Sequence, residues 1–429
     1  MRRAALAVLV ALGASVALTL PAPEPSGSLD PILPPTRRDT PAIWYCPGAA
    51  FEADVGLTAA ALAPFRARFS LTESGDLEDG GSYDATGTIS VDLGEVHRYY
   101  PGASIVELTR GATAVSSLYS GPTTLAAETC FGELAKEWYL TGGSVAADDQ
   151  LVLRLFNPTL QTAKVDVQVT TELGLDPAPQ LDGIGIRGLG FTEVRLHELE
   201  GIRQQVSLVV IPQEGAVVPW MARTTRFGTA LWGGGGVARE WLFPVANRPT
   251  LTAVLFLHNP GSEEVTTSVE LFGVAGPIPG PEAVVVPGGG VSQVSFTSSA
   301  GSAAGLRVSA SGPLAATVVA EGSGGLAAIA GLGKANHWLV PGGGGAGVLR
   351  SLVVLNPGPE ATTVTVSTLA GEVFVSPSMP PGSLFETVVG VEAVEVTSDG
   401  QVSVGWIASL GGETAFAGAV PLAGDTTAE

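Results

Sequence analysis

The sequence Leu257-His258-Asn259-Pro260 ends an apolar run that follows Trp241, and the same arrangement occurs twice more in the chain. The other two copies run from Trp138 to Asn157-Pro158 and from Trp338 to Asn356-Pro357. The tryptophans are 103 and 97 residues apart, and the asparagines are 102 and 97 residues apart. Because two independent markers share one spacing, the sequence predicts an internally repeated chain.

Each Asn-Pro precedes a polar turn and then a strand in which apolar and polar residues alternate, as at 164–169 and 265–271. Alternation with a period of two is typical of a strand with one buried face. Glycine-punctuated turns follow, so each unit offers about seven short strands. The sequence therefore predicts an all-β chain of tandem immunoglobulin-like β-sandwiches. We name them units 1 to 4 and place them at residues 43–135, 136–238, 239–335 and 336–429. A β-propeller built of paired blades is the alternative, since two blades also fit one repeat.

Unit 1 is degenerate. It opens with Trp44-Tyr45-Cys46-Pro47, but Phe69-Ser70-Leu71-Thr72 and an acidic loop stand where we align the Asn-Pro of the other units. The two cysteines of the chain, Cys46 and Cys130, lie at the two ends of this unit. In an exported chain an even number of cysteines predicts a disulfide, and two buried free thiols are the alternative.

The N-terminus has the features of an export signal. Arg2 and Arg3 precede an apolar run at residues 4–20. This pattern predicts that residues 1–20 are a signal peptide or a signal anchor, and the sequence leaves both open. Residues 21–42 are rich in proline and predict a semi-rigid linker. We therefore expect an extracellular or cell-surface protein, with residues 4–20 as its only contact with the membrane.

The pattern of tryptophan openings, Asn-Pro after an apolar strand and a Val-x-Val-Pro-Gly strand, as at 284–288, resembles repeats in exported, often membrane-anchored actinobacterial proteins of unknown function. The opening at Trp44 and the cysteine at position 130 are similar to the first domain of that family. The resemblance implies a location in the cell envelope. It implies no activity and no site residues.

The charge of the chain limits its partners. The formal net charge is −20, with 41 acidic and 21 basic residues. A protein that binds nucleic acid needs a basic surface to neutralise phosphates, so nucleic acid is excluded as a partner. An envelope protein or an envelope glycan is the expected partner.

Few residues suggest a binding site. Trp232, beside four glycines, and Tyr99-Tyr100 are the candidates for an exposed aromatic platform that binds sugar. The four repeated tryptophans and His258 are expected to be packed, and the glycine runs at 233–236 and 342–345 are expected to be flexible joints. The acidic loop at 73–79, with Asp84 beyond it, offers oxygen ligands that would suit calcium, although its spacing is not that of a dedicated calcium loop. Otherwise no cofactor is expected.

No nucleophile motif or zinc-binding spacing is present in the sequence. The sequence therefore favours a non-enzymatic envelope protein that acts as a structural or protein-interaction rod. A carbohydrate-binding array for a cell-wall polysaccharide is the alternative, and an envelope glycan hydrolase is the third hypothesis.

Overall fold

The strands fall into four groups that follow one another along the chain. The computed structural model describes residues 42–48, 53–73, 76–93, 103–109, 111–121, 124–146, 148–199, 201–280, 283–296, 304–345 and 347–422. In unit 1 the strands are β1 (Ala42–Cys46), β2 (Asp54–Glu73), β3 (Asp76–Asp92), β4 (Ser104–Leu108), β5 (Thr113–Gly121) and β6 (Thr124–Thr129). In unit 2 they are β7 (Trp138–Gly143), β8 (Gln150–Phe156), β9 (Ala163–Thr171), β10 (Gly174–Asp176), β11 (Ile184–Ile186), β12 (Phe191–Arg195), β13 (Val206–Glu214), β14 (Val218–Thr225) and β15 (Gly228–Gly233), with the short helices η1 (Pro179–Leu181) and α3 (Leu196–Leu199).

Units 3 and 4 contain strands alone in their described parts. Unit 3 has β16 (Ala238–Asn247), β17 (Leu251–Asn259), β18 (Val265–Gly273), β19 (Gly276–Ile278), β20 (Val284–Val286), β21 (Gly290–Phe296), β22 (Ala304–Gly322) and β23 (Gly325–Ala330). Unit 4 has β24 (Ala335–Val340), β25 (Leu349–Asn356), β26 (Thr362–Thr368), β27 (Val373–Val375), β28 (Ser378–Met379), β29 (Ser383–Val389), β30 (Val394–Leu410), β31 (Glu413–Gly418) and β32 (Val420–Pro421). Within the described ranges, each strand pairs only with strands of its own unit. Residues 1–41, with the predicted signal and most of the linker, lie outside the described residues.

Unit 2 shows the two-sheet plan most clearly. One sheet has the order β10-β9-β13-β7, with β11 also on β9, and the other has the order β12-β8-β14-β15. Residues of β9 alternate between buried and more exposed positions, as the sequence pattern predicts. In units 3 and 4 the long strands β22 and β30 pass from one sheet into the other, and in unit 1 β2 and β3 do so.

The prediction of an all-β chain of sandwiches is confirmed. In unit 2 the closing hairpin β14–β15 joins β8, the second strand of the unit. The immunoglobulin-like type of the repeat stays a prediction.

The asparagine of each Asn-Pro makes the same buried network. Asn259 Nδ2 donates to the main-chain oxygens of Glu263, Val286 and Pro287 at 2.7, 3.3 and 3.1 Å, and its Oδ1 accepts from the Gly261 N–H at 3.0 Å. The corresponding bonds are present at Asn157 and Asn356. The motif thus fastens the turn that follows one strand to the hairpin beside it.

Unit 1 has alanine in this position. Thr58 of β2 and Phe256 of β17 are equivalent, because they pair with equivalent residues of β5 and β22. Ala61 lies three residues after Thr58 and Asn259 lies three residues after Phe256, so these two positions correspond. The sequence alignment, which placed residues 69–72 there, was therefore wrong. With no Asn-Pro turn to end the strand, β2 continues directly into the other sheet.

The first strand of each unit pairs with the segment that follows the closing hairpin. The residue after each repeated tryptophan makes this pairing: Tyr45 with Phe131, Tyr139 with Gly235, Leu242 with Leu332 and Leu339 with Val420. In unit 1 the Cys46–Cys130 disulfide lies beside this bridge and closes a sequence separation of 84 residues. The predicted disulfide is confirmed.

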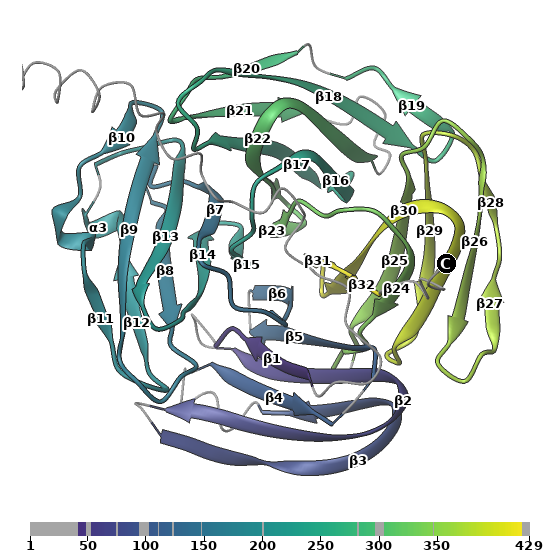
Figure 1. The fold of residues 1–429 in the computed structure, drawn as a ribbon. Coiled ribbons are helices and arrows are strands. Elements are labelled where there is room, and N and C mark those ends of the chain that lie inside the picture. Colours follow the sequence, from purple (N-terminus) through teal and green to yellow (C-terminus); the bar gives the residue numbers. More distant parts are fainter. Residues whose placement is uncertain are drawn as a thin grey trace, which may run out of the picture.

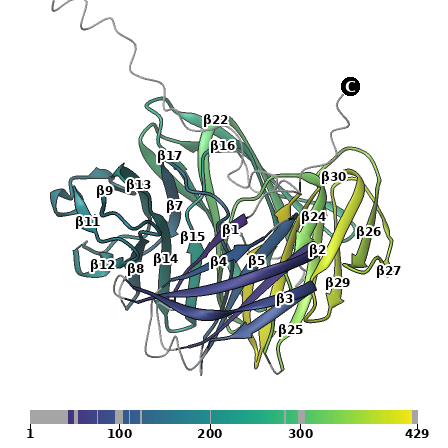
Figure 2. The same ribbon diagram turned by 60° about the horizontal axis from the view of Figure 1, so that its bottom comes forward.

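The four units are arranged in a closed ring and not in a rod. Figure 1 shows the units around a common centre, where the closing strands β6, β15, β23 and β31 lie, and Figure 2 shows the same ring from a tilted direction. Each of these strands contacts the next, and β31 contacts β6. We call the contact between two units a seam and number it by its units. Seam 4–1 closes the ring and includes a hydrogen bond of 2.5 Å from Thr129 Oγ1 to the Gly418 oxygen.

The units share their apolar cores across the seams. Leu326 and Ala328 of unit 3 lie in one cluster with Trp232 of unit 2, and Phe416 of unit 4 lies in the cluster of unit 3. Ala127 of unit 1 lies in the cluster of unit 4. Each closing hairpin thus covers the open edge of the preceding core, so the units stabilise one another.

Matched side-chain sizes distinguish the seams. A Cβ on Gly233 would overlap the Phe131 ring, and a Cβ on Gly418 would lie 2.7 Å from Leu332 Cδ2. At seam 2–3 Gly235 is equivalent to Phe131 and Ala330 is equivalent to Gly233. At seam 4–1 the corresponding residues are Val420 and Thr129. The large residues Phe131 and Leu332 therefore each meet a glycine, whereas a Cβ on Gly235 would have no neighbour within 4 Å.

Gly233 and Gly342 of the two glycine runs lie at seams, so the expectation of flexible joints was wrong for them. Gly234 packs against the Trp138 side chain. The Gly342 oxygen accepts a hydrogen bond of 3.0 Å from Ser116 Oγ of unit 1. A Cβ on Gly342 would lie 2.6 Å from the Val391 oxygen. These positions require glycine because another chain segment occupies the space of a side chain.

Candidate functional site

A groove of about 580 Å³ lies on unit 2, where the edges of its two sheets face each other. It is lined by Gln180, Leu181, Ile184, Thr192, Glu193, Val194, Arg195, Glu198 and Leu199. The lining residues come from η1 and β11 on one side and from β12 and α3 on the other. Leu181 and Val194 are buried, and Leu199 is 43% exposed. The volume is in the range of ligand-binding sites.

A chain of ion pairs lies on the β12–α3 side of this groove. Glu193 Oε2 lies 2.9 Å from Nη2 of the buried Arg154, and its Oε1 lies 3.4 Å from Arg195 Nε. Arg195 Nη1 lies 3.3 Å from Glu198 Oε1. Desolvation lowers the pKa of Arg154, and Glu193 opposes that shift. Glu193 is thus held in place by a buried cation, whereas the exposed Arg195–Glu198 pair adds little stability.

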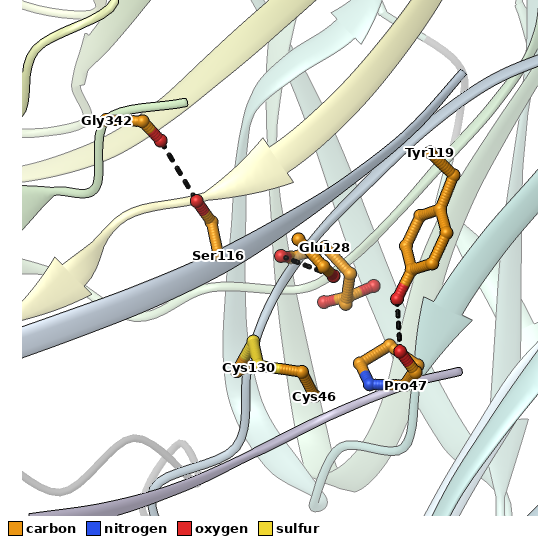
Figure 3. Close-up of a disulfide and its surroundings, with 8 residues drawn as sticks. Cys46, Pro47, Ser116, Tyr119, Glu128, Cys130 and Gly342 are labelled. Atoms are coloured by element: carbon orange, nitrogen blue, oxygen red, sulfur yellow. Dashed lines mark hydrogen bonds between the residues drawn. A yellow bond between two sulfur atoms is a disulfide. The ribbon is translucent and has the colours of Figure 1, made fainter. Parts of the chain in front are cut away.

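A second polar site lies at seam 1–2, next to the disulfide (Figure 3). Glu128 Oε2 accepts a hydrogen bond of 3.2 Å from the Gly233 N–H. The Tyr119 hydroxyl donates to the Pro47 oxygen. Desolvation raises the pKa of Glu128 to about 8, although hydrogen bonds from Gly233 and Thr129 oppose the shift. Burial therefore favours the protonated form of Glu128.

Sequence reasoning missed Glu128. The equivalent residues of the other closing strands are Trp232, Ile329 and Ala417, all of which are buried. A single acid within the apolar stretch 125–129 was the available signal. Without the register of the closing strands, this acid could not be assigned to a core position.

The proposed aromatic platform is not present at Trp232. This residue is fully buried, and its Nε1 donates to the Thr141 oxygen at 2.9 Å. It completes the core of unit 2, so it cannot stack on a sugar. Tyr99 and Tyr100 lie outside the described residues. All four repeated tryptophans are buried, as expected for core residues.

Two other buried polar side chains have structural roles. His258 is 1% exposed at seam 2–3, with its ring 6.4 Å from that of Tyr139, and burial lowers its pKa to about 4. Arg350 lies over the Trp406 ring and donates to the main-chain oxygens of Pro341, Gly390 and Glu392. The expectation that His258 is packed is confirmed.

The acidic loop considered for calcium is part of the β2–β3 hairpin. Asp79 lies 4.0 Å from Arg68, and Asp76 and Glu78 are exposed. Within the described part of the chain, no three acidic, histidine or cysteine residues are arranged to hold a metal ion. The described residues also contain no helix with the length and apolar character needed to cross a bilayer.

Comparisons with known proteins assign no activity. No curated protein matches the sequence. A serine-rich repeat protein (Srr2) from Streptococcus agalactiae is 9% identical, with 46% of this chain and 80% of that chain covered and a TM-score of 0.13. An α-L-rhamnosidase from Streptomyces avermitilis, solved with L-rhamnose, is 11% identical, with 84% and 56% covered and a TM-score of 0.13. At such TM-scores neither likeness supports a fold or a function. A family of unknown function, DUF5719, matches residues 237–377, which span unit 3 and the first strands of unit 4.

Proposed function

We propose that the protein is a non-enzymatic scaffold of the cell envelope that presents a rigid, acidic ring to other envelope components. The ring replaces the rod expected from tandem units. Its closure is the observation that carries the proposal, since the last unit packs on the first through Thr129, Ser116 and Thr88. A closed ring holds its outer loops at fixed relative positions, which suits the binding of several partners.

The use of the polar side chains supports a structural role. The side-chain amides of the three Asn-Pro asparagines form hydrogen bonds to main-chain oxygens within the fold. The disulfide is in keeping with an oxidising compartment outside the cytoplasm. The carbohydrate-array hypothesis loses its leading residue, because Trp232 is buried.

Location and partners are tested together on intact cells that produce the full chain. A photo-cross-linking residue is placed at the exposed Leu160, and in a matched control at the buried Leu155. We expect protease digestion of intact cells to remove the protein, and we expect cross-links to envelope components from position 160 alone. Protein that stays protected inside the cell would contradict the proposal. So would hydrolysis of envelope glycan that is lost on changing a single carboxylate.

A further inference from the structure

The groove of unit 2 runs along the free edge of a strand. The lining includes the consecutive residues Thr192, Glu193, Val194 and Arg195 of β12. Side chains of consecutive strand residues point to opposite faces, so a groove touched by all four follows the main chain between them. Among the described strands β12 pairs with β8 alone, and β11, across the groove, pairs with β9 alone. Two unpaired edges therefore face the same space.

We propose that this groove binds an extended, basic polypeptide segment, which adds to β12 as a further strand. Free N–H and C=O groups at a sheet edge are the usual template for such strand addition. The buried Leu181 and Val194 offer an apolar surface to every second side chain of the incoming segment. The remaining side chains would point toward the rim of the groove, which we define by its charged residues Glu193, Arg195 and Glu198.

The net charge of the chain determines the charge of the partner. Glu193 and Glu198 are balanced locally by Arg154 and Arg195, whereas the chain as a whole carries a formal net charge of −20. Glu193 cannot turn away, because Arg154 holds one of its oxygens. Lysine or arginine side chains of a bound segment can displace the exposed Arg195 from Glu198, whose side chain is 57% exposed. An acidic segment, including a second copy of this chain, would be repelled.

The chemistry of the lining favours a polypeptide over a sugar. No aromatic side chain lines the groove, whereas sugar sites usually provide a flat ring for stacking. The groove instead supplies main-chain groups in a row, which match another extended main chain. This inference deepens the proposed function by naming the partner class of one surface, and it rests on that proposal.

The test uses the purified full chain and three synthetic peptides of equal length. One alternates valine with lysine, one alternates valine with glutamate, and one consists of glycine and serine. Binding is measured by calorimetry, and hydrogen exchange locates the contact. We expect only the lysine peptide to bind, with slower exchange of the amides of β12 (Phe191–Arg195).

Two charge reversals make the test specific. Glu198→Lys changes the rim at an exposed position and is expected to weaken binding of the lysine peptide roughly tenfold. Glu264→Lys makes the same charge change at an exposed site on unit 3 and is expected to leave binding unchanged. Absence of binding, equal binding of the glutamate peptide, or protection outside β12 would overturn the inference. Any of these results would leave the scaffold proposal intact, because that depends on surface location and partners in cells.

Discussion

The Asn-Pro network gives a sharp prediction, because Asn259 faces three oxygens and one N–H at once. Asn259→Ala removes these four hydrogen bonds from a position that is 1% exposed, and of the four groups the Pro287 oxygen keeps the bond that it accepts from the Gly290 N–H. At about 1 kcal/mol or somewhat less for each lost bond, the free energy of unfolding should fall by about 3 kcal/mol. The measurement is urea denaturation followed by tryptophan fluorescence, because the tryptophans lie in the cores.

Asn259→Asp tests the direction of the bonds. The introduced carboxylate has no N–H for the three oxygens and cannot be solvated, so at pH 8 it should cost about 2 kcal/mol more than alanine does. The surrounding oxygens raise the pKa of that carboxyl in the folded state above its ordinary value of about 3.9. The extra cost should therefore be absent at low pH and should appear as pH rises through the raised pKa.

Asn336→Asp provides the matched control, because it makes the same chemical change at an exposed position. It should alter the free energy of unfolding by less than about 0.5 kcal/mol. If Asn259→Asp were as stable as Asn259→Ala at pH 8, or if the exposed change cost as much, the reasoning would be refuted. Equal costs at pH 8 and at pH 3 would refute the account of the charge, because only below the ordinary pKa is the extra cost absent.

Three further predictions concern seam 1–2 and the clamp of unit 1. Gly233→Ala should lower the midpoint of thermal unfolding by several degrees, because the new methyl group overlaps the packed phenyl ring of Phe131. Gly235→Ala should leave the midpoint unchanged, because its methyl group has no neighbour within 4 Å. Equal midpoints for the two variants would contradict the seam packing. Glu128 binds its proton more tightly in the folded state (pKa about 8), so its contribution to stability is full below its ordinary pKa of 4.5 and is lost as pH rises through 8. Glu128→Gln should therefore be more stable than the parent protein at pH 9 by up to about 4 kcal/mol, and the advantage should vanish near pH 4; a constant difference across that range in urea titrations would show that ionisation is not the cause. Replacing Cys46 and Cys130 together by alanine should lower the free energy of unfolding by about 4 kcal/mol, since their bridge closes a sequence separation of 84 residues, and an unchanged urea midpoint would count against the clamp.

The repeat, the strands and the disulfide could be predicted because each depends on a local pattern or on a count. Alternation along 164–169 and 265–271 specifies which strand face is buried, whatever lies beyond that face. With two cysteines in the chain, one pairing exists. The ring could not be predicted in this way, because its seams join residues such as Thr129 and Gly418, 289 positions apart.

The errors at the candidate sites have the same origin. Trp232 looked exposed because four glycines follow it, yet Gly233 and Gly234 lie where neighbouring chain segments pack closely. The groove beside β12 depends on which strands lie at sheet edges, and that is decided by pairing with β8 and β9. Composition and periodicity give burial but not the partner that causes it.

The pairing of large and small residues at the seams restricts how such a gene can change. Unequal recombination readily alters the copy number of a repeat in open, solenoid-like arrays, where each repeat meets interchangeable neighbours. Here the loss of unit 2 would bring Phe131 against Ala330 in place of Gly233, and the joined halves would no longer fit. Loss of unit 2 alone would thus open the ring, although it would leave the other three repeats unchanged in sequence.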